Sequence, residues 1–599
     1  MNTTNRILFI TLLCALFSMA MYGQKTYLSP TRVAVNQEGT EAYVVLSTAQ
    51  ALAKVSLENE ALLETIPLKF NPSDVCCSID GKTLYATEYS AYGKLHLLSP
   101  SSGETKKSVS VGAYPAAIGI NKEGTIAWVA NRFSNDLSVI DLKKNKEIKR
   151  LAMVREPKSL ALSPDGKILA IGNFLSSQSA VEPPVSAQVT LVDTEKMEVI
   201  DHVVLPDGSQ SIADVCFSKD GSLLYVTHLL SRYPFPTTQL ERGWMNTNAL
   251  SLIDISVKKH YTTVLLDDMY RGVANPCGMA ISEDGNTLFV AASGTHELVS
   301  LNLPALTQKI KETTFTDVTN NLTFLSELKT RIPLSGKGAR YPFARNGKVF
   351  VTDYFSGGLS VIDEYDVTNK RVIKLGEEPE PDEIRKGELF FSDAALCFQN
   401  WQSCVSCHPE ARVDGLNWDL VNDGLGNPKN TKSMLYAHVT PPSMMTGIRA
   451  NAEVAVRAGI KHIQFATRPE EDAVCIDKYL QSITPLPSPY LTQKGELSKP
   501  AKQGEALFKQ TGCLECHYGE YYTDGKMYNV GTGIEEYTNV SFDTPTLKEI
   551  WRTAPYLYNG SAKTIKEVLT TFNREDKHGI TSNLSEQEIE ALEEYILSL

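Results

Sequence analysis

Short runs of alternating apolar and polar residues recur from about residue 25 to residue 375. In each copy a proline or small residue opens a run, an acidic-Gly or Asn-Gly turn follows, and further runs lead to an Asp. X-Gly between two alternating strands is a strong hairpin signal. Seven units of this kind predict an all-β, seven-bladed β-propeller over residues 25–376. The seven turn glycines are Gly39, Gly81, Gly124, Gly166, Gly221, Gly285 and Gly347.

The repeats resemble the YVTN-type propeller repeat, as in Tyr225-Val226-Thr227. Two insertions stretch the later repeats, from Leu229 to Asn248 and from Pro304 to Lys329. Long loops in a compact repeat are often functional, although a floppy surface loop is the alternative. Residues of the first insertion are therefore candidates to face a partner: Arg232, Tyr233, Phe235, Arg242 and Trp244.

The pattern changes after a charged, proline-bearing linker at residues 376–381. Helical spacing of apolar residues then predicts two further domains, at 382–486 and 497–599, joined by a proline-rich connector. The chain ends in a predicted helix whose N-cap is Ser585, with Glu588 completing a capping box.

Each of these two domains contains one C-x-x-C-H motif, which is the attachment signature of c-type haem. Cysteines three residues apart on a helical turn can form thioethers to one porphyrin, and the following histidine can bind the iron. A redox dithiol or half of a zinc site is the alternative, but two copies followed directly by His favour haem. The motifs predict two covalently bound haem c groups in two all-α c-type cytochrome domains. The attachment residues are Cys404, Cys407 and His408, and Cys513, Cys516 and His517.

Charge and the N-terminus indicate the compartment. The net charge of −12 argues against a nucleic-acid partner and against docking on anionic lipid. Arg6 precedes an apolar run from Ile7 to Met21, which is the pattern of a secretory signal peptide at residues 1–23. We therefore expect a periplasmic product with no membrane span.

An oxidising compartment permits disulfides, and Cys397 with Cys475 is a candidate pair.

The last 220 residues resemble the bacterial dihaem cytochrome c peroxidase family, which includes the MauG-like enzymes. The match rests on Gly387-Glu388-Leu389-Phe390-Phe391 before the first motif. It also rests on Phe542-Asp543-Thr544-Pro545-Thr546-Leu547 and Thr553-Ala554-Pro555-Tyr556 after the second. The resemblance implies one six-coordinate haem that stores an electron, a second haem that meets hydrogen peroxide, and a calcium ion between the modules.

The resemblance also directs attention to the distal faces of both haems. At the position where the family has a methionine ligand to the second haem this chain has Phe572, which leaves His578 as the candidate metal ligand. For the first haem it points to Glu453 as acid/base and to Arg449 as the neighbouring catalytic residue, and an exposed helical Glu453 is the alternative. The family's inter-haem tryptophan is replaced by Met444, Met445 and Thr446.

These features predict a periplasmic dihaem oxidoreductase that reduces or uses hydrogen peroxide. Its electron donor would be a small cytochrome or cupredoxin, and the propeller would dock or position a protein substrate. The alternatives are a non-catalytic electron-transfer protein and a propeller-led binding protein with a haem relay.

Overall fold

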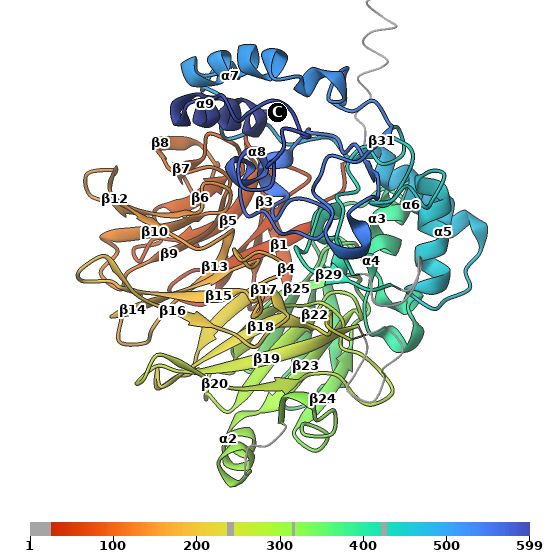
Figure 1. Cartoon of the computed structure of the whole chain (residues 1–599). Helices are drawn as coiled ribbons and strands as arrows, with labels where there is room; N and C mark the ends of the chain where they lie inside the picture. The colour runs from red at the N-terminus through yellow and green to blue at the C-terminus, as the bar shows by residue number, and fades with distance from the viewer. Residues whose placement is uncertain (1–25, 236–244, 314–317, 421–427) are drawn as a thin grey trace, which may run out of the picture.

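The computed structural model describes residues 26–235, 245–313, 318–420 and 428–599. The predicted signal peptide, and Arg242 and Trp244 of the first insertion, lie outside the described residues. Seven four-stranded antiparallel sheets run from red to green in Figure 1, and a largely helical C-terminal part runs from cyan to blue.

Each propeller blade is built from four consecutive strands. Blades 1 to 4 comprise β1 Pro30–Val35, β2 Glu41–Leu46, β3 Ala51–Ser56, β4 Ala61–Pro67; β5 Pro72–Cys77, β6 Leu84–Glu88, β7 Lys94–Leu98, β8 Thr105–Ser110; β9 Pro115–Ile120, β10 Ile126–Asn131, β11 Asp136–Asp141, β12 Lys146–Ala152; β13 Pro157–Leu162, β14 Ile168–Asn173, β15 Gln188–Asp193, β16 Glu198–Val204. Blades 5 to 7 comprise β17 Ser209–Phe217, β18 Leu223–Ser231, β19 Asn246–Asp254, β20 Lys259–Leu265; β21 Pro276–Ile281, β22 Thr287–Ala292, β23 Glu297–Asn302, β24 Lys329–Pro333; β25 Ala339–Arg345, β26 Lys348–Asp353, β27 Gly358–Asp363, β28 Lys370–Lys374.

The first strands of the blades neighbour one another in a closed ring, in which β25 of the last blade lies beside β1 of the first. No strand is exchanged between these two blades, because each is complete by itself. Side chains close the ring instead: Leu46 and Val361 share one buried cluster, and Lys348 and Arg371 both bind the carboxylate of Glu60. The predicted seven-bladed propeller is confirmed.

The predicted turn glycines lie in the hairpins between the first and second strands, and all seven have positive φ. At Gly81 an added Cβ would meet nothing within 4 Å, so its φ of +66° is what favours glycine there. Asp80 supports this turn by accepting hydrogen bonds from Ser78 Oγ and from the backbone N–H of Lys82.

The C-terminal part contains two helical modules. The helices are α3 Glu383–Ser392, α4 Cys404–Cys407, α5 Ala452–His462 and α6 Glu470–Ser482 in the first module, and α7 Lys499–Gln510, α8 Ile565–Leu569 and α9 Glu586–Leu597 in the second. Two short hairpins accompany them, β29 Asn417–Trp418 with β30 Lys429–Asn430 and β31 Met527–Tyr528 with β32 Phe542–Asp543. The predicted capping box of Ser585 and Glu588 is present at the start of α9.

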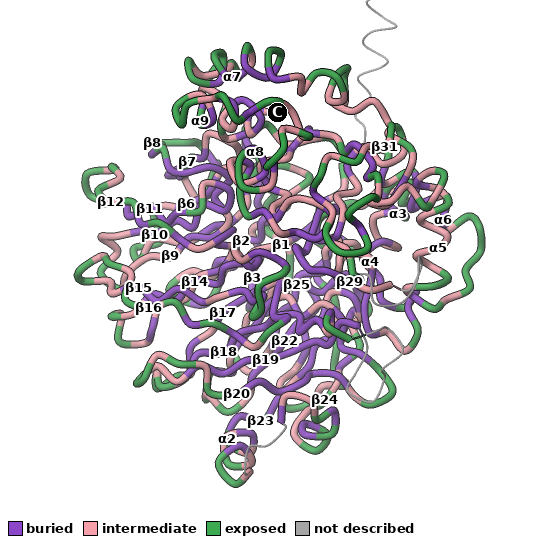
Figure 2. The backbone as a smooth tube through the Cα atoms, in the orientation of Figure 1, coloured by how far each residue is buried: buried purple, intermediate pink, exposed green. Residues whose placement is uncertain are grey.

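The two helical modules cover one face of the propeller, the face opposite the glycine turns (Figure 1). Arg132 from the β10–β11 turn contacts Glu410, and Arg155 donates to the carbonyl of Ala554. Figure 2 shows buried backbone running through the blades, with exposed backbone at the turn tips. Because the cytochrome modules occupy this face, only the rim and the opposite face of the propeller are open to another protein.

Described residues of both insertions contact the first module. The insertion between β18 and β19 places Tyr233, which is 8% exposed, in one cluster with Trp401 and Trp418 of the first module. The second insertion carries α2 Leu303–Glu312, and its Leu322 joins the same cluster. Among the described residues of the first insertion that were candidates to face a partner, Phe235 is exposed at 38%. No helix in the described ranges combines the length and apolarity needed to cross a membrane.

Candidate functional site

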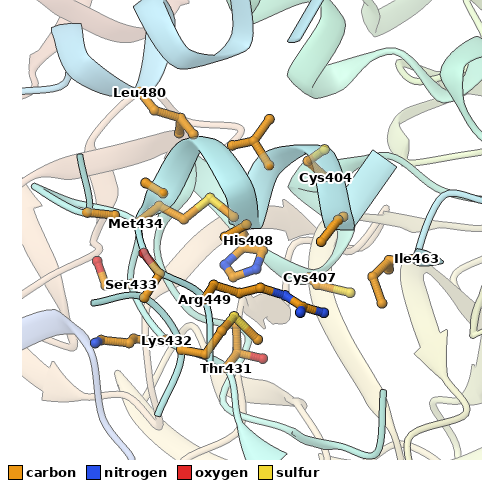
Figure 3. Close-up of a pocket in the computed structure, with 18 of the residues that line it drawn as sticks. Cys404, Cys407, His408, Thr431, Lys432, Ser433, Met434, Arg449, Ile463 and Leu480 are labelled. Carbon is orange, nitrogen blue, oxygen red and sulfur yellow. The ribbon is translucent and has the colours of Figure 1, made fainter. Parts of the chain in front are cut away.

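The first C-x-x-C-H motif opens onto a cavity of about 240 Å³. Helix α4 presents Cys404 and Cys407 from one turn, and His408 follows at its end. Figure 3 shows His408 among the lining residues, with Met434, Ile463 and Leu480 around it. A largely apolar cavity that contains both thiols and the imidazole fits a covalently held porphyrin.

The orientation of His408 also suits an iron ligand. Its Nδ1–H donates to the carbonyl oxygen of Arg412 at 3.1 Å, which leaves Nε2 with a free lone pair. Burial lowers the pKa of His408 to about 4, so the imidazole is neutral, as metal binding requires.

The propeller itself holds this motif in place. Asn246 at the start of β19 donates from Nδ2 to Sγ of Cys407 at 3.3 Å. Asn275, just before β21, donates to Ser403 Oγ and accepts from Ser406 Oγ, both at 2.8 Å. Propeller residues are therefore part of the environment of the first haem site.

The two residues predicted for the distal side of the first haem, Arg449 and Glu453, differ in their position relative to the cavity. Arg449 lines the cavity, whereas Glu453, on the first turn of α5, is not among the lining residues. The methionines that stand in place of the inter-haem tryptophan, Met444 and Met445, line the cavity as well. Among the described residues that line the cavity, His408 is the sole histidine.

Gln464 is a lining residue that the sequence pattern did not indicate. It is 7% exposed, and its side-chain oxygen is buried without a hydrogen-bond partner in the described structure. A buried amide oxygen without a partner costs free energy unless something binds it, so Gln464 is a candidate to contact a ligand. Gln464 lies just after α5, and only the three-dimensional packing brings it to the cavity. No sequence motif around it would have indicated this.

The second C-x-x-C-H motif repeats the arrangement of the first. His517 donates from Nδ1 to the carbonyl oxygen of Tyr522 at 3.0 Å, and burial lowers the pKa of its imidazole. Cys513 packs in the core formed by α7, α8 and α9, which includes Phe508 and Leu592. The donating Nδ1 and the lowered pKa that suit His408 to an iron are thus also present at His517.

The structure brings His578 opposite His517. Their ring centres lie 6.3 Å apart with the planes inclined by 39°. An imidazole–metal bond of about 2 Å on each side, plus roughly 1.1 Å from nitrogen to ring centre, places two imidazoles that share one metal about 6.2 Å apart. Nδ1 of His578 is buried without a partner among the described residues, and burial, followed by His517, lowers the pKa of His578 to about 4. Two neutral imidazoles at this distance fit the two axial positions of one iron.

The two modules are structural repeats of each other. Gly387 in α3 lies against the carbonyl of Cys475, and Gly504 in α7 lies against that of Ala591, so a Cβ at either glycine would clash with backbone. Tyr436 and Glu549, at corresponding places after the two motifs, both have left-handed backbones with φ of 62° and 61°. Isolated bridges Ser443–Arg449 and Tyr556–Ala562 follow in the same order.

Ion pairs join the two modules to each other and to the propeller. Glu549, which is fully buried, binds Arg412 across the module interface and accepts from the backbone N–H of Leu486 at 2.7 Å. Glu410 binds Arg132 of the propeller at 2.5 Å and Arg552 of the second module at 2.6 Å. These two arginines hold the pKa of Glu410 well below its usual value, although burial opposes them.

The predicted disulfide between Cys397 and Cys475 is wrong, because both thiols are free. Cys475 packs its backbone against Gly387 of α3, whereas Cys397 lies beside Trp401 and Gln402 next to the first motif. Both cysteines belong to the first module, but their neighbours differ.

Comparison with known proteins agrees with this arrangement. A family model described as RoxA-like, cytochrome c-like matches residues 541–578. Hydrazine synthase subunit gamma of Kuenenia stuttgartiensis is 29% identical over 275 residues, covering 36% of this chain and 77% of that protein. Cytochrome c551 peroxidase of Nitrosomonas europaea is 24% identical, covering 34% of this chain and 76% of that protein.

The methylamine utilization protein MauG of Methylophilus methylotrophus is 20% identical, covering 35% of this chain and 78% of that protein. A solved structure of Kuenenia stuttgartiensis hydrazine synthase superposes with a TM-score of 0.53 at 20% identity, covering 57% of this chain and 97% of that chain, which shows a shared fold. The cytochrome c peroxidases and MauG that the chain resembles are haem oxidoreductase enzymes, and the chain combines a cytochrome c-like region related to theirs with a seven-bladed β-propeller.

Proposed function

We propose that the protein is a periplasmic dihaem peroxidase-type oxidoreductase with one haem c at each C-x-x-C-H motif. The observation that carries this proposal is the asymmetry between the two sites. His578 faces His517 in the second module, while the cavity at His408 has no second histidine among its lining residues. Met434, Met444 and Met445 also line that cavity, and in our proposal their thioethers pack there rather than bind iron. On this proposal the second site would saturate its iron, and the first would keep a coordination position for a small molecule.

Haem at His408 supplies the redox chemistry, and the protein supplies the surroundings. Arg449 can donate hydrogen bonds to a peroxide oxygen, and Gln464 can accept one through its side-chain oxygen, which has no partner among the described residues. Apolar side chains such as Ile460 and Ile463 exclude bulk water, which strengthens these contacts. Glu453 remains our candidate for moving a proton, and it would need a water molecule to reach the cavity from the first turn of α5.

The second site would store an electron delivered from outside. Leu514 and Tyr518, which flank its cysteine and histidine, are 37% and 48% exposed, and the carboxylates of Glu515 and Glu520 are exposed nearby. Exposed apolar residues with an acidic rim suit a small cytochrome or cupredoxin with a basic docking surface. A protein substrate would bind the open rim or far face of the propeller, since the near face is covered. We assign no residues to calcium, because no group of three His, Cys, Asp or Glu side chains in the described ranges could hold a metal ion.

A second candidate substrate is a small nitrogen compound in place of peroxide. It is supported by the identity with hydrazine synthase subunit gamma, which at 29% exceeds the 24% identity with the peroxidase of Nitrosomonas europaea. The cavity at His408 is as suitable in size for hydrazine as for peroxide.

Stepwise reduction of the purified holoprotein under EPR and optical spectroscopy tests the proposal. We expect one permanently low-spin haem and one that becomes high-spin and reacts with hydrogen peroxide. Two permanently low-spin haems and no reaction with peroxide would instead favour a non-catalytic electron-transfer protein. A spectral change with hydrazine but none with peroxide would favour the second candidate.

A further inference from the structure

A pair of tyrosines crosses the interface between the two haem-binding modules. The rings of Tyr436 and Tyr521 have centres 4.8 Å apart and planes inclined by 56°. This is the separation of a favourable aromatic contact. Tyr436 comes from the first module and Tyr521 from the second.

Each tyrosine is attached directly to the surroundings of one haem site. Leu435 and Ala437, on either side of Tyr436, line the cavity at His408. Tyr521 immediately precedes Tyr522, whose carbonyl oxygen accepts the hydrogen bond from His517. The pair therefore connects the wall of one site to the backbone that orients the iron ligand of the other.

Hydrogen bonds hold this contact at a fixed geometry. Thr546 donates from Oγ1 to the carbonyl of Tyr521 at 2.6 Å, and Thr546 itself lines the cavity at His408. The backbone N–H of Asp543 donates to the carbonyl of Met445, another lining residue, at 3.0 Å. Thr546 of the second module thus forms part of the wall of the first site, and Asp543 is hydrogen-bonded to that wall.

The structural repeat shows that an aromatic pair is not required for packing at this place. Tyr436 occupies the position that Glu549 occupies in the other module, with the same left-handed backbone. There the contact across the interface is the ion pair of Glu549 with Arg412. One of the two equivalent contacts is ionic, and the other is made of two aromatic rings.

We propose that Tyr436 and Tyr521 form the electron path between the two haem sites. This inference rests on the proposed function, in which each site holds a haem. With haem held by both histidines, one electron would pass from the reduced haem at His517 through the two rings to the haem at His408 once peroxide had oxidised the latter. No bond breaks and no proton moves at the pair. Burial, followed by the neighbouring Tyr521, raises the pKa of Tyr436, which is consistent with a phenol that stays protonated.

The test uses the full holoprotein without peroxide. A reducing pulse populates the haems unevenly, and optical spectroscopy follows the redistribution of electrons between them. In Tyr436→Leu and Tyr521→Leu we expect redistribution to be several-fold slower, with both haems still bound. In Tyr436→Phe and Tyr521→Phe we expect a rate close to that of the wild type, because the rings remain.

The matched control is Tyr558→Leu, since Tyr558 packs on Tyr537 and Phe542 within one module. Redistribution at the wild-type rate in both Leu variants, with full haem content, would overturn the proposal. Phe variants as slow as the Leu variants would overturn transfer through closed-shell rings, because the phenol group would then be essential. A further outcome is that the wild type fails to react with peroxide while electron redistribution is still slower in the Leu variants. That result would contradict the proposed function and leave the electron path supported.

Discussion

The imidazole rings of His517 and His578 face each other with their centres 6.3 Å apart, while the cavity at His408 has no second histidine among the described residues that line it. The same fold, used twice in one chain, therefore offers a closed axial pair in one copy and an open face in the other.

Replacing His578 should convert the second site from low-spin to high-spin. In His578→Ala the iron would lose its distal nitrogen, so the low-spin EPR signal assigned to this site should disappear while haem content stays at two per chain. In His578→Met the site should remain low-spin with a higher reduction potential, within the roughly 0.8 V over which axial ligands tune haem. Unchanged EPR and potential in both variants would contradict ligation by His578.

Replacing Arg449 should slow the reaction with peroxide. Arg449→Leu removes the cationic donor from the cavity, and loss of one such donor typically lowers turnover by about 10²-fold. Glu453→Gln gives a direct comparison, because that residue is not among those that line the cavity, and we expect a smaller loss. Stopped-flow mixing with peroxide measures both. If Glu453→Gln slowed the reaction with peroxide more than Arg449→Leu, Glu453 rather than Arg449 would be the more important polar group.

Breaking the ion pair between Arg412 and Glu549 should destabilise the module interface. Both side chains are at most 5% exposed, so Glu549→Gln would leave a buried guanidinium without its partner, at a cost of about 3–5 kcal/mol. Chemical denaturation followed by haem absorption measures the change. The double variant Arg412→Met with Glu549→Gln is the control, since it leaves no unpaired guanidinium and keeps a side-chain oxygen for the N–H of Leu486, so most of the stability should return.

The stability of the propeller should fall as pH rises from about 4 to 7. Burial raises the pKa of Asp353 from its usual 3.8 to about 7 in the folded chain, so the folded state binds the proton more tightly than the unfolded state. That contribution is present below the unfolded pKa and is lost as pH rises through the folded pKa. One carboxylate oxygen of Asp353 has no partner in the described structure, and the other accepts from Ser360 at 2.7 Å.

Asp353→Asn should therefore raise the thermal midpoint at pH 8 and change it little at pH 5. Circular dichroism at the two pH values measures this difference. An equal effect at both would show that ionisation of Asp353 does not contribute.

Features encoded by local spacing could be predicted from the sequence. The turn at Gly81 needs only Asp-Gly between alternating runs, and the two C-x-x-C-H motifs need only five consecutive residues. His578 could be singled out because few other histidines were available in the last third of the chain. Its position opposite His517 needed the folded loop between α8 and α9.

Features that depend on contacts between distant segments could not be predicted. Asn246 and Cys407 are 161 residues apart, and nothing in the pattern around Asn246 indicates a contact with a haem motif. The insertion containing Tyr233 resembles a solvent loop in composition but is covered by Trp401 and Trp418. Gln464 is similarly indistinguishable from a surface glutamine until α5 places it in the cavity.

The hydrogen bond from Asn246 to Cys407 has a consequence for how the protein matures. In the closed structure the thiol of Cys407 is half-buried and packs beside propeller residues. We therefore expect haem to be attached more readily while the C-terminal segment is still undocked, so that cofactor loading precedes closure of the cytochrome modules onto the propeller.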